Sequence, residues 1–240
     1  MSNMKLVRVL PVCALLLGAC QSTNSNSVSP FAGNTSSTRT TQGATNTGRG
    51  NGQVNGGEGW QLVGRQAPGF SLADANGQRV SLGDFRGKTV VLEWFNPKCE
   101  FVSSLHENGT FGNTAQGLSS QGVQFIAINS TAPGNIGFSS AYGQAMCNQW
   151  DVEYPLLADP NGTVQSQFGV TLSPTVVVID PQGVVRYFGA PDNSPLGNQR
   201  GNTYVNHVQN AINAIQAGEE VKRPTTKEYG CEIERQNRAN

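Results

Sequence analysis

The sequence predicts an α/β domain in which a mixed β-sheet has a parallel core, an antiparallel edge and flanking helices. Two apolar runs, at residues 89–95 and 123–128, have the length and continuity of strands that are buried on both faces. A helical pattern at residues 139–150 separates the second run from later strands, and this alternation is typical of α/β proteins. Residues 184–188 follow a turn at 180–183 and are expected to pair back as the antiparallel edge.

Local patterns justify each element in turn. Residues 70–72 and 80–82 alternate in polarity around Asn76-Gly77, which indicates a β-hairpin. Apolar residues recur at helical spacing between residues 204 and 217. The remaining expected elements are a strand at 89–95, a helix from about residue 100, a strand at 123–128, helices at 139–150 and 163–168, and strands at 175–179 and 184–188.

The chain divides into four parts by composition. We expect residues 1–19 to be a signal peptide, 20–58 a lipidated cysteine followed by a polar tether, 59–217 the folded domain, and 218–240 a polar C-terminal tail that contains Cys231. Ser, Asn, Thr, Gly and Gln make up almost all of the tether, so it buries too little apolar area to offset its ordering entropy. Its reach is roughly 35 Å, enough to hold the domain away from a surface.

Charge and composition exclude several classes of function. Lys and Arg number 16, as do Asp and Glu, so the net charge is zero and no nucleic-acid partner is expected. No apolar run is long enough to span a bilayer. With two histidines and no C-x-x-C pair, neither a metal site nor a cofactor is expected.

The first twenty residues indicate export. Lys5 and Arg8 precede an apolar stretch that ends in Leu-Gly-Ala-Cys at residues 17–20, and this pattern resembles the bacterial lipobox. The resemblance implies a lipid anchor on Cys20, with the domain facing the periplasm or the cell exterior. Gln21 after the cysteine implies the outer membrane if the source is Gram-negative. The alternative is an ordinary signal peptide.

Cys99 is the principal candidate for chemistry. It follows a buried strand and begins a helix, whose first-turn amides lower a thiol's pKa, and Lys98 could add to this effect. Glu93 lies six residues earlier in the strand, where burial would raise its pKa and suit it to transfer a proton. A solvent-facing Glu93 is the alternative. His106 could tune the thiolate, but a lone surface histidine is the favoured interpretation.

Two separated stretches resemble the AhpC/TSA redoxin superfamily. Residues 67–92 resemble its opening, and Gly-Val-Thr-Leu-Ser-Pro-Thr at 169–175, followed by a strand, resembles the thioredoxin-fold cis-proline turn. The resemblance covers residues 62–217. It implies a thioredoxin-like fold with an N-terminal β-hairpin extension. It also implies a cis Pro174 whose neighbours Ser173 and Thr175 can bind an extended substrate, although an ordinary trans proline is the alternative.

The sequence departs from both parent patterns. Val102 stands where a C-x-x-C motif has its second cysteine, and Asn96 and Leu92 replace the peroxiredoxin Thr or Ser and Pro. Arg186 could replace the missing peroxide-activating arginine, but an exposed strand arginine is favoured. Residues 96–102, together with Tyr-Gly-Cys at 229–231, resemble a branch with an Asn-Pro-x-Cys-x-Phe-Val site, except that Glu100 replaces the usual proline.

Three thiols remain after lipidation, so at most one internal disulfide can form. Cys99–Cys231 is the first expectation, because Cys231 lies in a polar tail that can move as a resolving cysteine must. Cys147 is either buried and inert or paired with Cys231. The leading hypothesis is a membrane-anchored thiol oxidoreductase that acts on a thiol/disulfide protein or a peroxide and is restored by an external thiol reductant. The alternative is a non-catalytic envelope domain stabilised by a disulfide.

Overall fold

The computed structural model describes residues 57–234, so the predicted signal peptide, lipidated Cys20 and most of the tether lie outside the described residues. The strands are β1 (Ser71–Asp74), β2 (Arg79–Ser81), β3 (Val90–Trp94), β4 (Gln124–Asn129), β5 (Leu156–Ala158), β6 (Leu172–Ser173), β7 (Val176–Ile179), β8 (Val185–Gly189) and β9 (Cys231–Glu232). The α-helices are α1 (Glu100–Glu107), α2 (Thr110–Ser119), α3 (Ser140–Gln149), α4 (Thr163–Phe168) and α5 (His207–Gln216).

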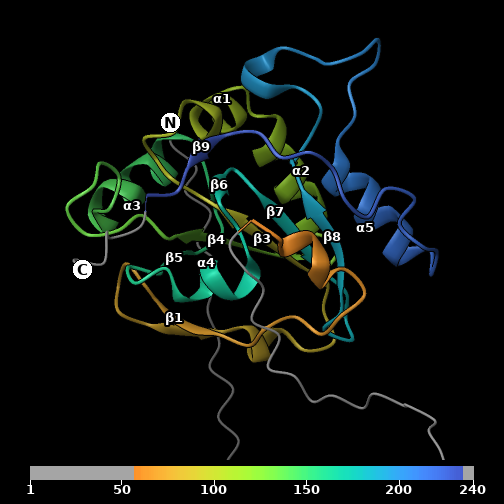
Figure 1. Ribbon diagram of the computed structural model, residues 1–240, viewed down its shortest axis with the longest axis horizontal. Coiled ribbons are helices and arrows are strands. Elements are labelled where there is room, and N and C mark those ends of the chain that lie inside the picture. The colour runs from red at the N-terminus through yellow and green to blue at the C-terminus, as the bar shows by residue number, and fades with distance from the viewer. Residues whose placement is uncertain (1–56, 235–240) are drawn as a thin grey trace, which may run out of the picture. The chain divides into compact units, whose positions relative to one another are not determined.

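A seven-stranded sheet in the order β2-β1-β5-β4-β3-β7-β8 forms the centre of the described domain (Figure 1). β3, β4 and β5 are parallel, β7 pairs antiparallel with β3, and β8 pairs antiparallel with β7. The β1–β2 hairpin joins the outer edge through β5, with Leu72 opposite Val80. This arrangement confirms the predicted α/β class and is a thioredoxin-like fold with an N-terminal hairpin extension.

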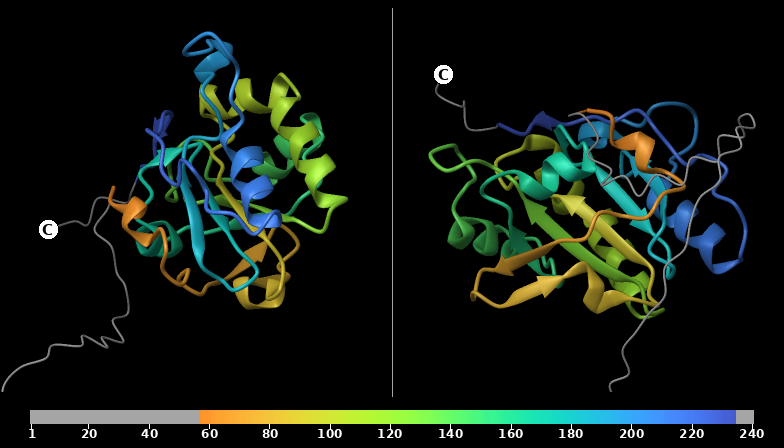
Figure 2. Two further views of the ribbon diagram at one scale, coloured as in Figure 1. Left: turned by 90° about the vertical axis from the view of Figure 1, so that its right-hand side faces the viewer. Right: turned by 60° about the horizontal axis from the view of Figure 1, so that its bottom comes forward.

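The strand period of two divides the core between the faces of the sheet. Leu92 and Trp94 of β3 join a cluster that α4 covers, while Val91 and Phe95 face the helices on the other side. Figure 2 shows helices on both faces of the sheet. Glu93 lies on the same side of β3 as Val91 and Phe95, so the sequence places a carboxylate within an apolar helix–sheet interface.

Several boundaries differ from the predictions. The single helix expected from residue 100 is two helices, because Gly109 adopts a φ of 68° between α1 and α2. α5 begins at His207 rather than at residue 204, because the Asn206 side chain accepts from the Gln209 amide and caps the helix there. The short strands β5, β6 and β9 were not predicted, since two or three residues carry no periodicity.

The segment at residues 224–234, here named the C-terminal strap, runs along the domain and adds β9 to β6 (Figure 1, dark blue). At one end, the Phe188 amide donates to the Pro224 carbonyl at 3.0 Å. Toward the other end, the Ile233 amide donates to the Thr171 carbonyl at 2.9 Å. The strap therefore connects the edge strand β8 with the loop before Pro174. Within residues 57–234, no helix combines the length and apolarity needed to cross a membrane.

Candidate redox site

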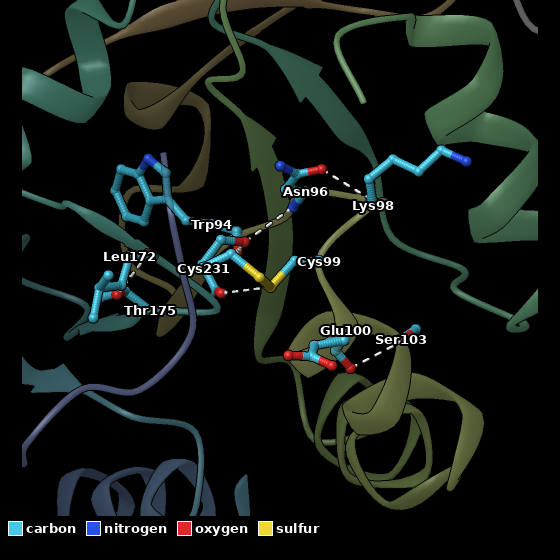
Figure 3. Close-up of a disulfide and its surroundings, with 10 residues drawn as sticks. Trp94, Asn96, Lys98, Cys99, Glu100, Ser103, Leu172, Thr175 and Cys231 are labelled. Carbon is cyan, nitrogen blue, oxygen red and sulfur yellow. Dashed lines mark hydrogen bonds between the residues drawn. A yellow bond between two sulfur atoms is a disulfide. The ribbon is translucent and has the colours of Figure 1, made fainter. Parts of the chain in front are cut away.

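A disulfide joins Cys99 and Cys231, whose Cα atoms are 5.8 Å apart (Figure 3). Cys99 is the N-cap of α1, and its carbonyl accepts the Ser103 amide at 3.0 Å. β3 ends five residues earlier at Trp94, so Cys99 sits at the predicted transition from strand to helix. Of the alternatives left open by the sequence, the structure has the Cys99–Cys231 pair, and Cys147 is free and buried.

Ser173 holds the cysteine and the proline loop together. The Cys99 Sγ lies 3.1 Å from the Ser173 carbonyl oxygen, which a reduced thiol could use as an acceptor. The Ser173 hydroxyl donates to the Trp94 carbonyl at 2.8 Å and accepts from the Asn96 amide at 3.0 Å. The Ser173–Pro174 peptide bond is cis, as the family resemblance implied. These bonds join the end of β3, the start of α1 and β6 into one unit.

The C-terminal strap covers Cys99 and the Ser173–Pro174 turn on their solvent side. Cys231 lies opposite Ser173 in the antiparallel β6–β9 pair. Gly230 has a φ of 143°, and a Cβ at this position would collide with the Ser173 carbonyl, so the close approach requires glycine. As a result Cys99 is 2% exposed, and Ser173 and Thr175 are buried. In this oxidised form the Cys99 side chain is closed to solvent.

Glu93 is fully buried and has two hydrogen-bond partners. Its Oε1 lies 2.8 Å from His106 Nε2, and its Oε2 accepts from the Tyr154 hydroxyl at 2.7 Å. His106 is 2% exposed, so the prediction of a surface histidine is wrong. The reason is that His106 stacks on Trp150, with an interplanar angle of 6°, and turns its ring into the interface between α1 and the sheet.

Burial dominates the electrostatics around Glu93. Desolvation, reinforced by the charge of Glu93, raises the pKa of the Cys147 thiol to about 12. The same two causes raise the pKa of Tyr154. His106 Nδ1 is buried and has no hydrogen-bond partner among residues 57–234, although both His106 and Tyr154 line a cavity of about 840 Å³ on the side of α2. The carboxylate is thus shielded from bulk water, but its two partners border this cavity.

Side-chain contacts of Glu228 and Tyr229 also hold the strap next to the Ser173–Pro174 turn. Thr175 Oγ1 lies 2.6 Å from Glu228 Oε1 and 2.8 Å from the Leu172 carbonyl. Burial raises the pKa of Glu228, opposed by the hydrogen bond with Thr175. The Tyr229 hydroxyl donates to the Asp192 carboxylate at 2.6 Å. Sequence reasoning missed Glu228 and Asp192, and only the Tyr-Gly-Cys string at residues 229–231 pointed to this part of the chain.

The cationic candidates lie away from the disulfide. Arg186 Nε donates to Asp180 Oδ2 at 2.7 Å, at the end of β7 opposite to Pro174. Its side chain is 47% exposed, as expected for an exposed strand arginine. Lys98 places its Nζ 4.4 Å from the centre of the Tyr142 ring, and Figure 3 shows it pointing away from the sulfur atoms. Within residues 57–234, no cluster of His, Cys, Asp and Glu could hold a metal ion.

With this geometry established, comparison with known proteins identifies the family. Residues 62–203 match the Redoxin family, which is more than half of the chain. The chain therefore belongs to the Redoxin family. This assignment agrees with the strand order of the sheet and with the cysteine at the N-terminus of α1.

The relatives represent two branches of thiol chemistry. The chain is 31% identical over 122 residues to the thiol-disulfide oxidoreductase ResA of Bacillus subtilis (strain 168), a match that covers 51% of this chain and 64% of ResA. It is 30% identical over 127 residues to the chloroplastic peroxiredoxin Q of Triticum aestivum, covering 50% of this chain and 55% of that protein. The chain thus spans less than two thirds of the length of these relatives.

Two solved structures share the fold at a TM-score of 0.66. One is a hypothetical protein, SMc02350, from Sinorhizobium meliloti 1021, with 23% identity over 72% of this chain and 94% of that chain. The other is an uncharacterized conserved protein from Geobacillus kaustophilus, with 22% identity over 74% of this chain and 94% of that chain. At this level of identity the likeness extends to the fold alone.

Proposed function

We propose that this protein is a thiol-dependent oxidoreductase in which Cys99 is the nucleophile and Cys231 the resolving cysteine. The observation that carries the proposal is the Cys99–Cys231 disulfide, located at the N-terminus of α1 and against the Ser173 carbonyl. Helix N-termini stabilise a thiolate, so Cys99 is the better nucleophile and leaving group of the pair. The reduced pair of thiols can donate an electron pair by forming this bond, and the disulfide can accept an electron pair in the reverse direction.

The proposed cycle has three balanced steps. The Cys99 thiolate attacks one sulfur of a substrate disulfide, which forms a mixed disulfide and releases one substrate thiolate. The Cys231 thiolate then attacks Cys99 Sγ, which forms the internal disulfide and releases the second substrate thiolate. An external dithiol reduces this disulfide and is itself oxidised, returning both cysteines to thiols. Each turn moves two electrons from the reductant to the substrate.

Disulfide exchange is the better-supported reaction of the two left open. Peroxide reduction needs groups that polarise the O–O bond, and Asn96 and Leu92 replace the Thr or Ser and the Pro that the resemblance associates with it. Arg186, the candidate substitute, is bonded to Asp180 at the far end of β7. Peroxide reduction would otherwise give a Cys99 sulfenic acid and an alcohol or water, after which Cys231 would form the same disulfide with loss of water.

Glu93 is proposed to transfer protons to and from the exchanging thiols. It lies on the face of β3 that carries Phe95, and Phe95 belongs to the same apolar cluster as Cys99 and Cys147. The Tyr154 and His106 hydrogen bonds fix the orientation of the carboxylate. His106 and Tyr154 are therefore positioning residues, and Pro174, Ser173 and Thr175 are proposed to position the substrate.

We also propose that the protein is exported and anchored to the bacterial membrane through lipid on Cys20. The leader pattern at residues 1–20 supports this, and the polar tether would hold the domain in the periplasm or outside the cell. In a Gram-negative source, Gln21 favours the outer membrane. Mass spectrometry of the mature N-terminus should find a diacylated Cys20, and an unmodified cysteine there would remove the anchor from the proposal.

The decisive experiment measures Cys99 itself. Alkylation of the reduced full chain against pH should show a Cys99 pKa well below the roughly 8.5 of a free thiol. Reduction of a model protein disulfide should be lost in Cys99→Ser, while Cys147→Ser retains it as a matched control. The rival function, a non-catalytic domain with a structural disulfide, is favoured by the burial of Cys99, and an unreactive Cys99 with an ordinary pKa would support it.

A further inference from the structure

The C-terminal strap occupies the place that a polypeptide substrate would need. β6 offers a two-residue edge beside the Cys99 sulfur, and β9 pairs with it in antiparallel register. Adding an extended segment to an exposed strand edge is a general mode of peptide recognition. Here the added segment belongs to the chain itself, and its cysteine is disulfide-bonded to the nucleophile. The oxidised structure therefore has the geometry of a mixed disulfide with an extended peptide.

Two occupants cannot share this edge. Ser173 faces Cys231 directly, and the Ile233 amide uses the Thr171 carbonyl on the same side. While the strap is in place, Cys99 is 2% exposed and Ser173 is 1% exposed. A substrate peptide must therefore wait for the strap to leave, and the strap must displace the peptide before Cys231 can reach Cys99 Sγ.

The two ends of the strap differ in how they are held. Residues 224–226 bond to the backbone of Phe188, which lies on β8 and away from the sulfur atoms. Residues 228–234 are held by the disulfide, the short β6–β9 pair, the Glu228 and Tyr229 side chains, the burial of Ile233 in the core and a backbone bond to Glu234. Reduction breaks the covalent bond that holds residues 228–234 and leaves the contacts of residues 224–226 unchanged. Residues 224–226 can therefore act as a hinge about which residues 228–234 move.

We propose that residues 228–234 are a redox-released placeholder for a polypeptide substrate. Reduction of Cys99–Cys231 frees the β6 edge, which then takes an extended peptide with its cysteine opposite Ser173. Return of the placeholder forms the internal disulfide and expels the product. This inference rests on the proposed function. It adds that the substrate is an extended cysteine-containing polypeptide and that its access is governed by the strap.

Gly230 allows the proposal to be tested by substitution. A Cβ on the residue before the paired cysteine would meet the Ser173 carbonyl, in the strap and in any peptide bound in its register. The same glycine-to-valine change should therefore have opposite effects in the two places. In the strap it weakens the placeholder and speeds capture of a peptide, whereas in the peptide it slows capture.

The first test is amide hydrogen exchange by mass spectrometry on the full chain, oxidised and reduced. The Ile233 amide should exchange at least about tenfold faster after reduction, while the β7 and β8 amides keep their protection. Equal protection of residues 228–234 in the two states would overturn the proposal. It would leave the thiol chemistry of Cys99 intact.

The second test uses the full-length Cys231→Ser variant and the peptide Tyr-Gly-Cys-Glu-Ile, activated as a mixed disulfide with thionitrobenzoate. Capture by Cys99 should be about tenfold slower for Tyr-Val-Cys-Glu-Ile, and about tenfold faster when the protein also carries Gly230→Val. Equal rates for all three combinations would overturn the placeholder. If Cys99 reacts with neither peptide nor with small disulfides, the proposed function itself fails, and the placeholder fails with it.

Discussion

His106 Nε2 lies 2.8 Å from Glu93 Oε1, and both side chains are buried between α1 and the sheet. An isolated buried carboxylate costs several kcal/mol, so hydrogen bonding is needed to keep Glu93 in this apolar interface. Tyr154 supplies the second bond.

Replacing Glu93 with Gln should slow the exchange step about 100-fold or more, because the amide cannot transfer a proton. Tyr154→Phe is the matched control, since it deletes one hydrogen bond but leaves the carboxylate. Stopped-flow rates with a model disulfide between pH 5 and 9 measure both variants. An unchanged rate in Glu93→Gln would remove this residue from the mechanism.

Cys147 should be inert in the folded protein. Burial and the charge of Glu93 raise the pKa of its thiol to about 12, so almost no thiolate exists at pH 8. Iodoacetamide should label it only after denaturation. Cys147→Ala should retain the Cys99–Cys231 disulfide and the activity, at a cost of about 1 kcal/mol in the free energy of unfolding. Labelling of Cys147 in the native state would contradict this prediction.

Glu228 should make attachment of the strap pH-dependent. Thr175 has one hydroxyl proton but two acceptors, Glu228 Oε1 and the Leu172 carbonyl, and a protonated Glu228 satisfies both by donating its own. Burial raises the pKa of Glu228, so its stabilising contribution is full at pH values below its unfolded pKa. That contribution is lost as the pH rises through the higher folded pKa.

The difference between the wild type and Glu228→Gln isolates this effect, because glutamine donates a hydrogen bond at every pH. Urea unfolding of the two oxidised proteins from pH 4 to 8 should show the variant gaining stability relative to the wild type as the pH rises. A constant difference across this range would mean that Glu228 does not titrate in the attached strap.

Tyr229 should anchor the strap more strongly than its neighbour Tyr204, although both hydroxyls reach the Asp192 carboxylate, at 2.6 Å and 3.2 Å. A buried hydrogen bond to a charged group contributes about 1.5–3 kcal/mol, and Tyr229 is buried whereas Tyr204 is 39% exposed. Tyr229→Phe should therefore lower the free energy of unfolding by that amount and speed reduction of the disulfide. Tyr204→Phe should change the free energy of unfolding and the rate of disulfide reduction far less. Equal effects of the two substitutions would show that Tyr229 does not anchor the strap.

Much of the fold was predictable because its elements carry local signals. The run at residues 89–95 and the Asn76-Gly77 turn are patterns that the structure reproduces as β3 and the β1–β2 hairpin. The strand-to-helix position of Cys99 was also local. By contrast, the pairing of Ser173 with Cys231 joins two strands of two residues each that lie far apart in the chain. Strands this short have no periodic pattern from which they could be predicted.

The site was predicted less completely than the fold. The sequence singled out Cys99, Glu93 and the Ser173–Pro174 turn, since each stands out against its immediate neighbours. The partners of Glu93 could not be deduced, because His106 and Tyr154 meet it only through the packing of α1 and the loop after α3. The surface interpretation of His106 failed because a short helix shows too few residues to define its buried face.

The parallel bridge between Phe188 and Thr225 has a practical consequence for deletion experiments. β8 is the last strand of the sheet, and residues 224–226 satisfy backbone groups that would otherwise be open to a second molecule. A chain shortened before Pro224 would lose Cys231 and would also expose the unpaired edge of β8, to which a second molecule could bind. Self-association of such a truncated chain could then be mistaken for a loss of redox activity. Single substitutions avoid this ambiguity because they leave the edge of β8 covered.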